Sequence, residues 1–237
     1  MSRTAILEHV KRITQMTVQT GPFAGLRLHD VQTWGNGEDI GPQLLGVYEQ
    51  ELHVTLEGFL RRRPSTIVNV GCAEGYYAVG LGLRLPRARI WAFDIDPKAQ
   101  EACRANAVLN DIGDRIDVLG ACSPSELGRI SAMDWNILAV LDCEGAEVAL
   151  VTSPASVAAL QHADILVEIH DFLDDTMLAS MMTSLASTHR LSLVFSGARN
   201  PHAFPFLDKW ADIDKWLLVC ENRPGLQKWM IAESRAH

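Results

Sequence analysis

Residues 67–80 read IVNVGCAEGYYAVG, an apolar strand that runs directly into a glycine turn and then into a helix. In an open α/β sheet this arrangement holds a nucleotide-like cofactor. Gly71 allows a sharp turn and a close approach to a ligand, and Gly75 allows the helix to pack near the strand with its first N–H groups directed into the crevice. An ordinary tight turn between a strand and a helix has the same pattern. The acidic residues further along the chain must therefore distinguish a cofactor-binding turn from an ordinary one.

The bulk composition predicts one large core with an N-terminal extension. The chain has 237 residues, 48% of them hydrophobic, and no linker rich in Pro, Gly or Ser. We expect a helical extension or lid at residues 1–63 and a cofactor-binding domain at residues 64–237. A formal net charge of −8 argues against a nucleic-acid partner. The basic run Arg61 to Arg63 is expected to complement the C-terminal dipole of a helix.

The cysteines indicate a reducing compartment. There are five, without C-x-x-C spacing, which disfavours a disulfide framework and a zinc site and favours the cytoplasm. The N-terminus has no leader pattern and no apolar run approaches the length that spans a bilayer, so we expect a soluble, unprocessed protein without a membrane partner. Six tryptophans and apolar helix faces leave room for a homodimer.

From residue 66 onward, short runs rich in Val and Ile alternate with amphipathic stretches, which is typical of a parallel sheet covered by helices. The expected strands are residues 66–70, 89–94, 115–119, 137–141, 165–169, 191–196 and 216–221. The expected helices are residues 5–16, 43–63, 76–85, 97–110, 125–131, 146–160 with a break or restart at Pro154, and 174–187, with a long loop at 29–42. We therefore predict an α/β fold with a doubly wound, seven-stranded, mostly parallel sheet. Its last strand is expected to be antiparallel, because residues 197–215 offer no full helical crossover.

Residues at the carboxyl ends of the strands should contact the cofactor. Asp94 follows the second strand about 20 residues beyond Gly75, where an acid reaches the hydroxyls of a ribose. A plain turn or cap role is the alternative for Asp94, and Asp96 is placed to cap the helix that starts at Pro97. After the third strand, Ser123 could meet the edge of an adenine.

The fourth and fifth strands end in acids and a histidine. Asp142 and Glu144 follow the fourth strand, and alternation puts Glu168 and His170 on one side of the fifth. Because these strands should be neighbours, we expect Asp142, Glu168 and His170 to converge, either as a general base oriented by an acid or as a site for a divalent metal.

Two alternatives to this convergent site stay open. His170 and Asp171 could cap the following helix, and Glu168 could pair with a buried arginine such as Arg199 or Arg223.

Two segments, VNVGCAEGYY at residues 68–77 and LDCEGAE at residues 141–147, resemble the class I S-adenosylmethionine-dependent methyltransferases and, more narrowly, their FkbM-like branch. The resemblance covers about residues 64–196. It implies S-adenosylmethionine as cofactor, methyl transfer commonly to a hydroxyl oxygen, and cofactor contacts at Gly71, Gly75 and Asp94. Many members have an acid two residues before the first glycine, where this chain has Asn69. We expect Asn69, Glu74, Ser123 and Asp142 among the cofactor-binding residues, and Glu74, Asp142 or an ordered water could supply the contact to the cofactor's amino group.

We therefore expect O-methylation of a small polar molecule. His170, backed by Glu168 or Asp171, would take the proton, or a cation such as Mg²⁺ at Asp142, Glu168 and His170 would first lower the pKa of the hydroxyl. The substrate contacts that we expect outside the sheet core are Trp34, Tyr48, Glu144 and Arg199, with core packing as the alternative for the aromatic residues.

Two other functions would use the same architecture. A nicotinamide-dependent oxidoreductase is disfavoured, because Glu74 puts a negative charge where a pyrophosphate would lie. A non-catalytic cofactor-binding protein on the same fold remains as the third possibility.

Overall fold

A computed structural model describes residues 3–31, 33, 39–170, 176–223 and 225–236. Trp34 and Asp171 lie outside these residues. In the described chain, one sheet contains β1 (Thr66–Val70), β2 (Arg89–Phe93), β3 (Ile116–Leu119), β4 (Ile137–Leu141), β5 (Asp164–Ile169), β6 (His189–Phe195) and β7 (Lys228–Ser234). Their order is β3-β2-β1-β4-β5-β7-β6. Strand β7 is antiparallel to both of its neighbours, and the pairs from β3 to β5 are parallel, which confirms the predicted fold class.

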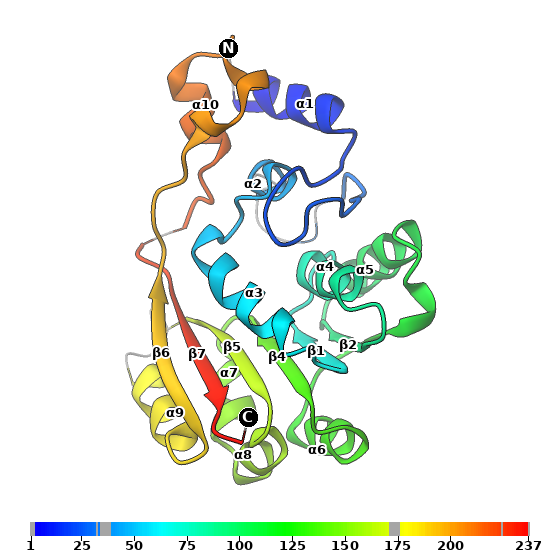
Figure 1. Ribbon diagram of the computed structural model, residues 1–237, viewed down its shortest axis with the longest axis vertical. Helices are drawn as coiled ribbons and strands as arrows, with labels where there is room; N and C mark the ends of the chain where they lie inside the picture. Colours follow the sequence, from blue (N-terminus) through cyan, green and yellow to red (C-terminus); the bar gives the residue numbers. More distant parts are fainter. Residues whose placement is uncertain (1–2, 32, 34–38, 171–175, 224, 237) are drawn as a thin grey trace.

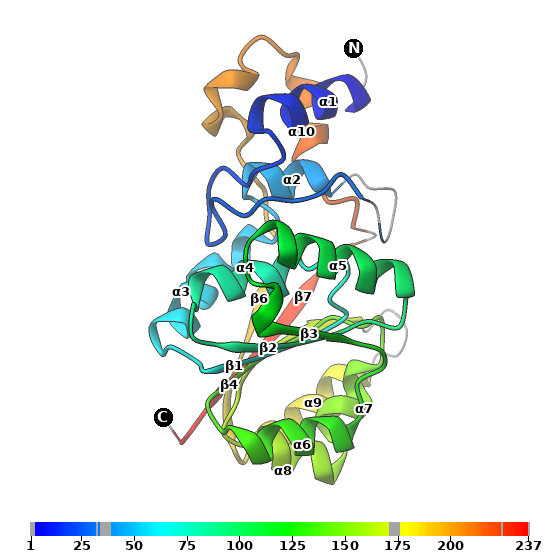
Figure 2. The ribbon, with the colours of Figure 1, turned by 90° about the vertical axis from the view of Figure 1, so that its right-hand side faces the viewer.

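Helices cover both faces of the sheet (Figures 1 and 2). One face carries α3 (His53–Arg61), α4 (Tyr76–Arg84) and α5 (Pro97–Leu109), and the other carries α6 (Pro124–Met133), α7 (Glu147–Thr152), α8 (Pro154–Leu160) and α9 (Met177–Leu185). Each face buries its own apolar cluster, because successive side chains of a strand point to opposite sides. The break expected at Pro154 is confirmed, since Ser153 caps α8 after α7 has ended.

A third group of helices lies beyond the α4 layer. It contains α1 (Arg3–Thr14), α2 (Ile40–Leu45) and α10 (Asp212–Leu218), and α1 packs against both α2 and α10 (Figure 2). Short 3₁₀ turns occur at Gln50–Leu52, Gly113–Arg115, Pro201–Ala203 and Pro205–Leu207. The two ends of the chain thus build this region together, and the predicted division at residue 63 stays a prediction.

The predicted strand at residues 216–221 is wrong. Residues 216–218 lie in α10, and the last strand is β7, which inserts between β5 and β6. A short apolar run suits either a helix or a strand, and here Asp212 and Asp214 in the first turn favour the helix through its dipole. Strand β7 is almost entirely buried, which is the environment that a central strand needs.

The single helix predicted at residues 43–63 is also wrong. The chain forms α2, a 3₁₀ turn and α3, with left-handed residues at Gly46 (φ 76°) and Glu49 (φ 46°) between them. Helix α2 also begins inside the stretch expected to be a loop. A Cβ at Gly46 would lie 2.0 Å from the carbonyl oxygen of Thr20, so close packing of the two segments requires a glycine there.

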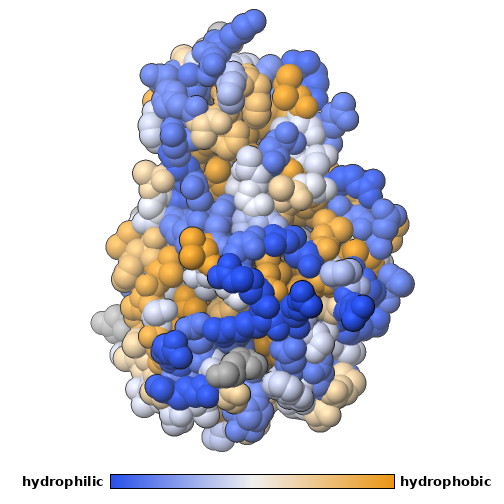
Figure 3. Space-filling view, viewed as in Figure 1, coloured by the Kyte–Doolittle hydropathy of each residue, from blue (hydrophilic) through white to orange (hydrophobic). Residues whose placement is uncertain are grey.

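One residue of the basic run at the end of α3 forms ion pairs of the fold: Arg62 pairs with Asp164 and Glu233. On α4, Arg84 pairs with Glu57. Figure 3 shows hydrophilic side chains gathered over this part of the surface. None of the helices in the described part of the chain combines the length and hydropathy of a membrane-spanning segment.

Candidate active site

A cavity of about 620 Å³ opens at the carboxyl ends of β1, β2, β4 and β5. Most of the site residues predicted from the sequence line it: Tyr48, Asn69, Gly71, Glu74, Asp94, Asp142, Glu144, Glu168 and His170. The lining, as far as the structure describes it, leaves out Gly75, Ser123 and Arg199. The cavity lies where an open α/β sheet binds its ligand.

Gly71 brings the loops after β1 and β4 into contact. Its φ is +77°, and a Cβ there would lie 1.5 Å from the carbonyl oxygen of Asp142. The backbone N–H of Asp142 donates to Val70 O at 2.9 Å, which holds the two loops together. Gly75 instead serves helix packing, because a Cβ there would lie 2.8 Å from the Sγ of Cys103 on α5.

Asp94 joins the end of β2 to the glycine turn. Its carboxylate accepts hydrogen bonds from the backbone N–H groups of Ala73 and Asp96, both at 2.9 Å. Asp96 caps α5 by accepting from Lys98 N, as expected. Ser123 caps α6 by accepting from Glu126 N, while Gly120, Ala121 and Cys122 before it line the cavity. An adenine contact in this region would therefore come from the backbone or from Cys122.

Asn69 lines the cavity and has a buried acceptor beside it. The residue is 2% exposed, and its Nδ2 donates to Val140 O at 3.3 Å. Because a carbonyl can only accept, this bond fixes the orientation of the amide. Its Oδ1 is buried and has no hydrogen-bond partner among the described residues. A buried acceptor of this kind needs a donor from a bound molecule or water.

Glu74 also lines the cavity, but the N-terminal extension already engages its carboxylate. Gln43 Nε2 donates to Oε1 at 2.7 Å, and Thr33 Oγ1 donates to Oε2 at 2.9 Å. Glu74 therefore ties the extension to the glycine turn.

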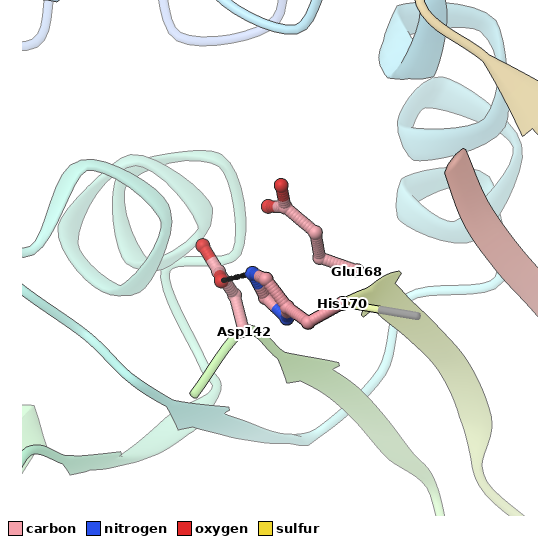
Figure 4. Close-up of side chains that lie close together, drawn as sticks. All are labelled: Asp142, Glu168 and His170. Carbon is pink, nitrogen blue, oxygen red and sulfur yellow. Dashed lines mark ion pairs between the residues drawn. The ribbon is translucent and has the colours of Figure 1, made fainter. Parts of the chain in front are cut away.

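The sheet register brings Asp142, Glu168 and His170 together. Leu141 of β4 pairs with Val167 of β5, so Asp142 and Glu168 come next to each other. Figure 4 shows the three side chains turned toward one another, and one ligand atom from each lies within 4.8 Å of the others. His170 Nε2 is 3.7 Å from Asp142 Oδ1 and 3.8 Å from Glu144 Oε2.

Glu147, which the sequence reasoning did not select, orients His170. It is fully buried, and its carboxylate accepts from Cys143 N at 2.6 Å and Gly145 N at 2.7 Å. Its Oε1 also lies 3.0 Å from His170 Nδ1. The sequence instead predicts Glu168 or Asp171 in this role. One feature of the sequence could have indicated this role of Glu147. It is an acid in the first turn of a helix, where its side chain can fold back and accept hydrogen bonds from unpaired backbone N–H groups.

The pair shifts both pKa values. Burial lowers the pKa of His170, but the hydrogen bond and charge of Glu147 outweigh it and raise the pKa above its ordinary value. Burial raises the pKa of Glu147, but the hydrogen bonds from His170 and Cys143 N outweigh it and lower the pKa. Glu147 is therefore ionised at neutral pH, and His170 Nδ1 must carry the proton that the two share.

A second unselected residue, Arg223, is the main cation of the cavity. It pairs with Glu168 at 2.5 Å, Glu49 at 2.6 Å and Glu221 at 2.9 Å. Burial lowers its pKa, but the charges of Glu49 and Glu168 outweigh it and raise the pKa. The alternative interpretation of Glu168, pairing with a buried arginine, is thus what the structure shows, although Glu168 also lines the cavity.

Arg199, expected as a substrate contact, lies outside this lining. It pairs with Glu51 at 2.7 Å and Glu221 at 2.5 Å, which fastens the segment after β6 to the 3₁₀ turn at 50–52. Arg199 therefore stabilises the packing of these two segments and does not line the cavity.

Two carboxyls that line the cavity, and Glu49 behind Arg223, have raised pKa values. Burial, followed by the charges of Glu168 and Glu49, raises the pKa of Asp142 well above its ordinary value. Burial and the charge of Glu168 raise the pKa of Glu49 to about 8, and burial and the charge of Glu221 raise that of Asp39 to about 7. The acids of this region therefore outnumber the cations that could stabilise them.

Comparisons with solved structures identify the class of fold. The O-methyltransferase TomG from Streptomyces achromogenes, solved with S-adenosylmethionine, matches with a TM-score of 0.52 and 12% identity over 81% of this chain and 82% of that chain. The delta-N METTL16 methyltransferase domain matches with a TM-score of 0.55 and 14% identity over 96% of each chain. The chain therefore has the class I S-adenosylmethionine-dependent methyltransferase fold.

Curated relatives match only a segment of the chain. The tRNA1(Val) (adenine(37)-N6)-methyltransferase of Porphyromonas gingivalis is 36% identical over 71 residues, 28% of each chain. The ribosomal protein L11 methyltransferase of Enterobacter sp. is 32% identical over 74 residues, 31% of this chain and 25% of that protein. The chain thus spans about a quarter of the length of these relatives. No family model matches.

Proposed function

We propose that the protein is an S-adenosylmethionine-dependent methyltransferase, of the FkbM-like type that its two motifs resemble, acting on a hydroxyl oxygen of a small polar molecule. One observation carries this proposal: the glycine turn, Asp94 and the His170 cluster line the same cavity. A cofactor bound along β1 and β2 would end beside the histidine.

The residues present suit this cofactor. Gly71 keeps the turn free of a side chain, Asp94 lies where ribose hydroxyls would donate, and the buried Asn69 Oδ1 beside the cavity has no partner among the described residues. When bound, the cofactor supplies an electrophilic methyl group. Glu74 beside the turn still disfavours a pyrophosphate, and hence the oxidoreductase alternative.

His170 is the proposed base. Because Glu147 accepts from Nδ1, the neutral ring leaves Nε2 as the acceptor, directed to the side of Asp142 and Glu144. Nε2 can then take the proton of a hydroxyl, and Glu147 stabilises the resulting imidazolium. The protein must otherwise align the hydroxyl and exclude water, which the buried walls of the cavity favour.

A divalent cation at Asp142, Glu168 and His170 is a second candidate role for the same cluster. The convergence of three ligand atoms favours it. Arg223 opposes it, because its guanidinium already neutralises Glu168 and would repel a cation. Activity that is lost in EDTA and restored by Mg²⁺ would favour the metal route.

We keep a small molecule as the proposed substrate class, since the chain is acidic and Arg62, in its basic run, is engaged in ion pairs. The relative named for a tRNA substrate makes RNA the competing class. Cytoplasmic location and a homodimer remain predictions of the sequence.

Calorimetry with S-adenosylmethionine, S-adenosylhomocysteine and NAD tests the cofactor. We expect the first two to bind, and Asp94→Asn to weaken both by at least about tenfold, the worth of one charge-assisted hydrogen bond. Asp117→Asn is the matched control, because its carboxylate lies on β3 and pairs with Arg89. Binding of NAD alone would refute the proposal.

Turnover tests the base. His170→Asn should retain cofactor binding and lose most methyl transfer when a panel of phenols, catechols and alcohols is screened for release of S-adenosylhomocysteine. Loss of cofactor binding in this variant would remove His170 from the role of base.

A further inference from the structure

The His170 cluster consists of Asp142, Glu168 and His170, each of which offers one ligand atom within 4.8 Å of the others (Figure 4). We propose that Arg223 is the resident cation of this cluster. It takes the place of a divalent metal, so the native protein leaves the cluster free of metal, and replacement of Arg223 creates a metal site. The inference goes beyond the proposed methyl transfer, because it concerns which cation these residues accept, whatever reaction they serve.

The first argument is the direct contact between Arg223 and the cluster. The guanidinium donates to Glu168 Oε1 at 2.5 Å, to Glu49 at 2.6 Å and to Glu221 at 2.9 Å. An arginine stays protonated at every working pH. Glu168, a member of the cluster, is therefore bonded to a permanent positive charge.

The second argument is that Arg223 is held in this position from several sides. Its guanidinium carbon lies 5.0 Å from the centre of the Trp229 ring and 5.9 Å from that of the Tyr48 ring. The sheet register pairs Trp229 of β7 with Glu168 of β5, so these two residues are cross-strand neighbours. Movement of Arg223 away from the cluster would leave Glu49 and Glu168, which are 2% and 6% exposed, buried without their cation. The guanidinium is therefore a fixed part of the site.

The third argument is the repulsion that a metal would meet. A small divalent ion lies about 2.1 Å from a carboxylate oxygen that binds it. Because Arg223 donates to one oxygen of Glu168 at 2.5 Å, a metal on either oxygen of this carboxylate would lie at most about 7 Å from the donating nitrogen. In a partly buried site, a full positive charge at that distance weakens the binding of a divalent ion by about a hundredfold.

The position of the guanidinium would itself suit a metal if the side chain were removed. Glu49, Glu168 and Glu221 surround it, and carboxylates are the ligands that Mn²⁺ and Mg²⁺ prefer. Alanine at position 223 leaves these three buried carboxylates without their shared cation. A divalent ion that enters the vacated space restores the balance of charge, with the His170 cluster beside it.

Under the proposed function, a resident guanidinium selects the His170 base over the metal route. The hydroxyl of the acceptor would then meet the Nε2 of His170 without a metal to lower its pKa.

Mn²⁺ binding to the full chain without cofactor tests the inference. Electron paramagnetic resonance follows the signal of free Mn²⁺ with the wild type, Arg223→Ala and Arg199→Ala. Arg199 is the matched control, because it is a buried arginine that pairs with Glu51 and Glu221 but lies outside the cavity lining. We expect Arg223→Ala to bind Mn²⁺ about a hundredfold more tightly than the wild type and the control. Mn²⁺ should also raise the Tm of Arg223→Ala alone, since an ion stabilises the form that binds it.

Submillimolar binding of Mn²⁺ by the wild type that Glu168→Gln weakens would overturn the inference, because the native cluster would then accept a metal beside Arg223. Equal affinity of Arg223→Ala and Arg199→Ala would overturn it as well. If the alanine variant does not fold, Arg223→Met, which keeps more of the packing, is judged by the same comparison. Folding of either variant only with Mn²⁺ would support the inference, and failure of both to fold even with Mn²⁺ would refute it. Because the experiment contains no cofactor, it can fail while S-adenosylhomocysteine still binds, which separates this inference from the proposed function.

Discussion

Replacing Gly71 with alanine should destabilise the protein and weaken cofactor binding together. Alanine at a φ of +77° costs roughly 1–2 kcal/mol. Its Cβ would begin 1.5 Å from Asp142 O, so the loops after β1 and β4 must separate by about 2 Å to reach ordinary contact. That movement strains the bonds from Asp142 N to Val70 O and from Gly71 N to Phe93 O, each worth about 1 kcal/mol. The sum is at least about 3 kcal/mol.

Differential scanning calorimetry measures this effect. For a chain of this length, 3 kcal/mol corresponds to a fall in Tm of about 6–12 °C. Gly128→Ala is the matched control, because Gly128 lies inside α6 and a Cβ there meets nothing within 4 Å. The control should be more stable by about 0.5–1 kcal/mol. A Gly71→Ala variant with the Tm and S-adenosylhomocysteine affinity of the wild type would refute the role given to the close loop contact.

Three further predictions concern the acids and their partners. Glu147→Gln should lower the pKa of His170, so that the acidic limb of kcat/KM against pH moves to lower pH; an unmoved limb would contradict the pairing. Asp39→Asn should gain stability relative to the wild type as pH rises from 4 to 8. The folded-state pKa of about 7 exceeds the ordinary 3.8, so the wild type loses stability across that window and asparagine does not titrate, whereas a Tm difference constant with pH would argue against the shift. Arg223→Met should lower the Tm by at least about 6 °C, because it leaves Glu49, Glu168 and Glu221 buried without their shared cation; a wild-type Tm would show that these acids are stabilised in another way.

The error at the last strand has a physical origin. Residues 216–221 and 228–234 are both short runs rich in apolar residues, and a pattern of that length does not separate a strand from a buried helix. Strand β7 becomes a strand because β5 and β6 offer it hydrogen-bonding edges on both sides. Only the assembled sheet contains those edges.

The broken helix at residues 43–63 has a similar cause. Its residues have adequate helix propensity, yet Glu49 adopts φ 46° and its side chain binds Arg223 and Tyr77. Contacts with residues distant in sequence therefore override the local preference.

Local sequence patterns were enough to predict the parallel core, the glycine turn and the positions of Asp94, Asp142, Glu168 and His170. These follow from local periodicity, and parallel strands bring residues at their carboxyl ends to one edge whatever the rest of the chain does. The pairing of the charges, in contrast, depends on the three-dimensional packing of the chain. Glu147 rather than Glu168 orients His170, and Arg223, 55 residues beyond Glu168, supplies the cation. Ion pairs between distant segments depend on how those segments pack in three dimensions, and sequence spacing does not encode that packing.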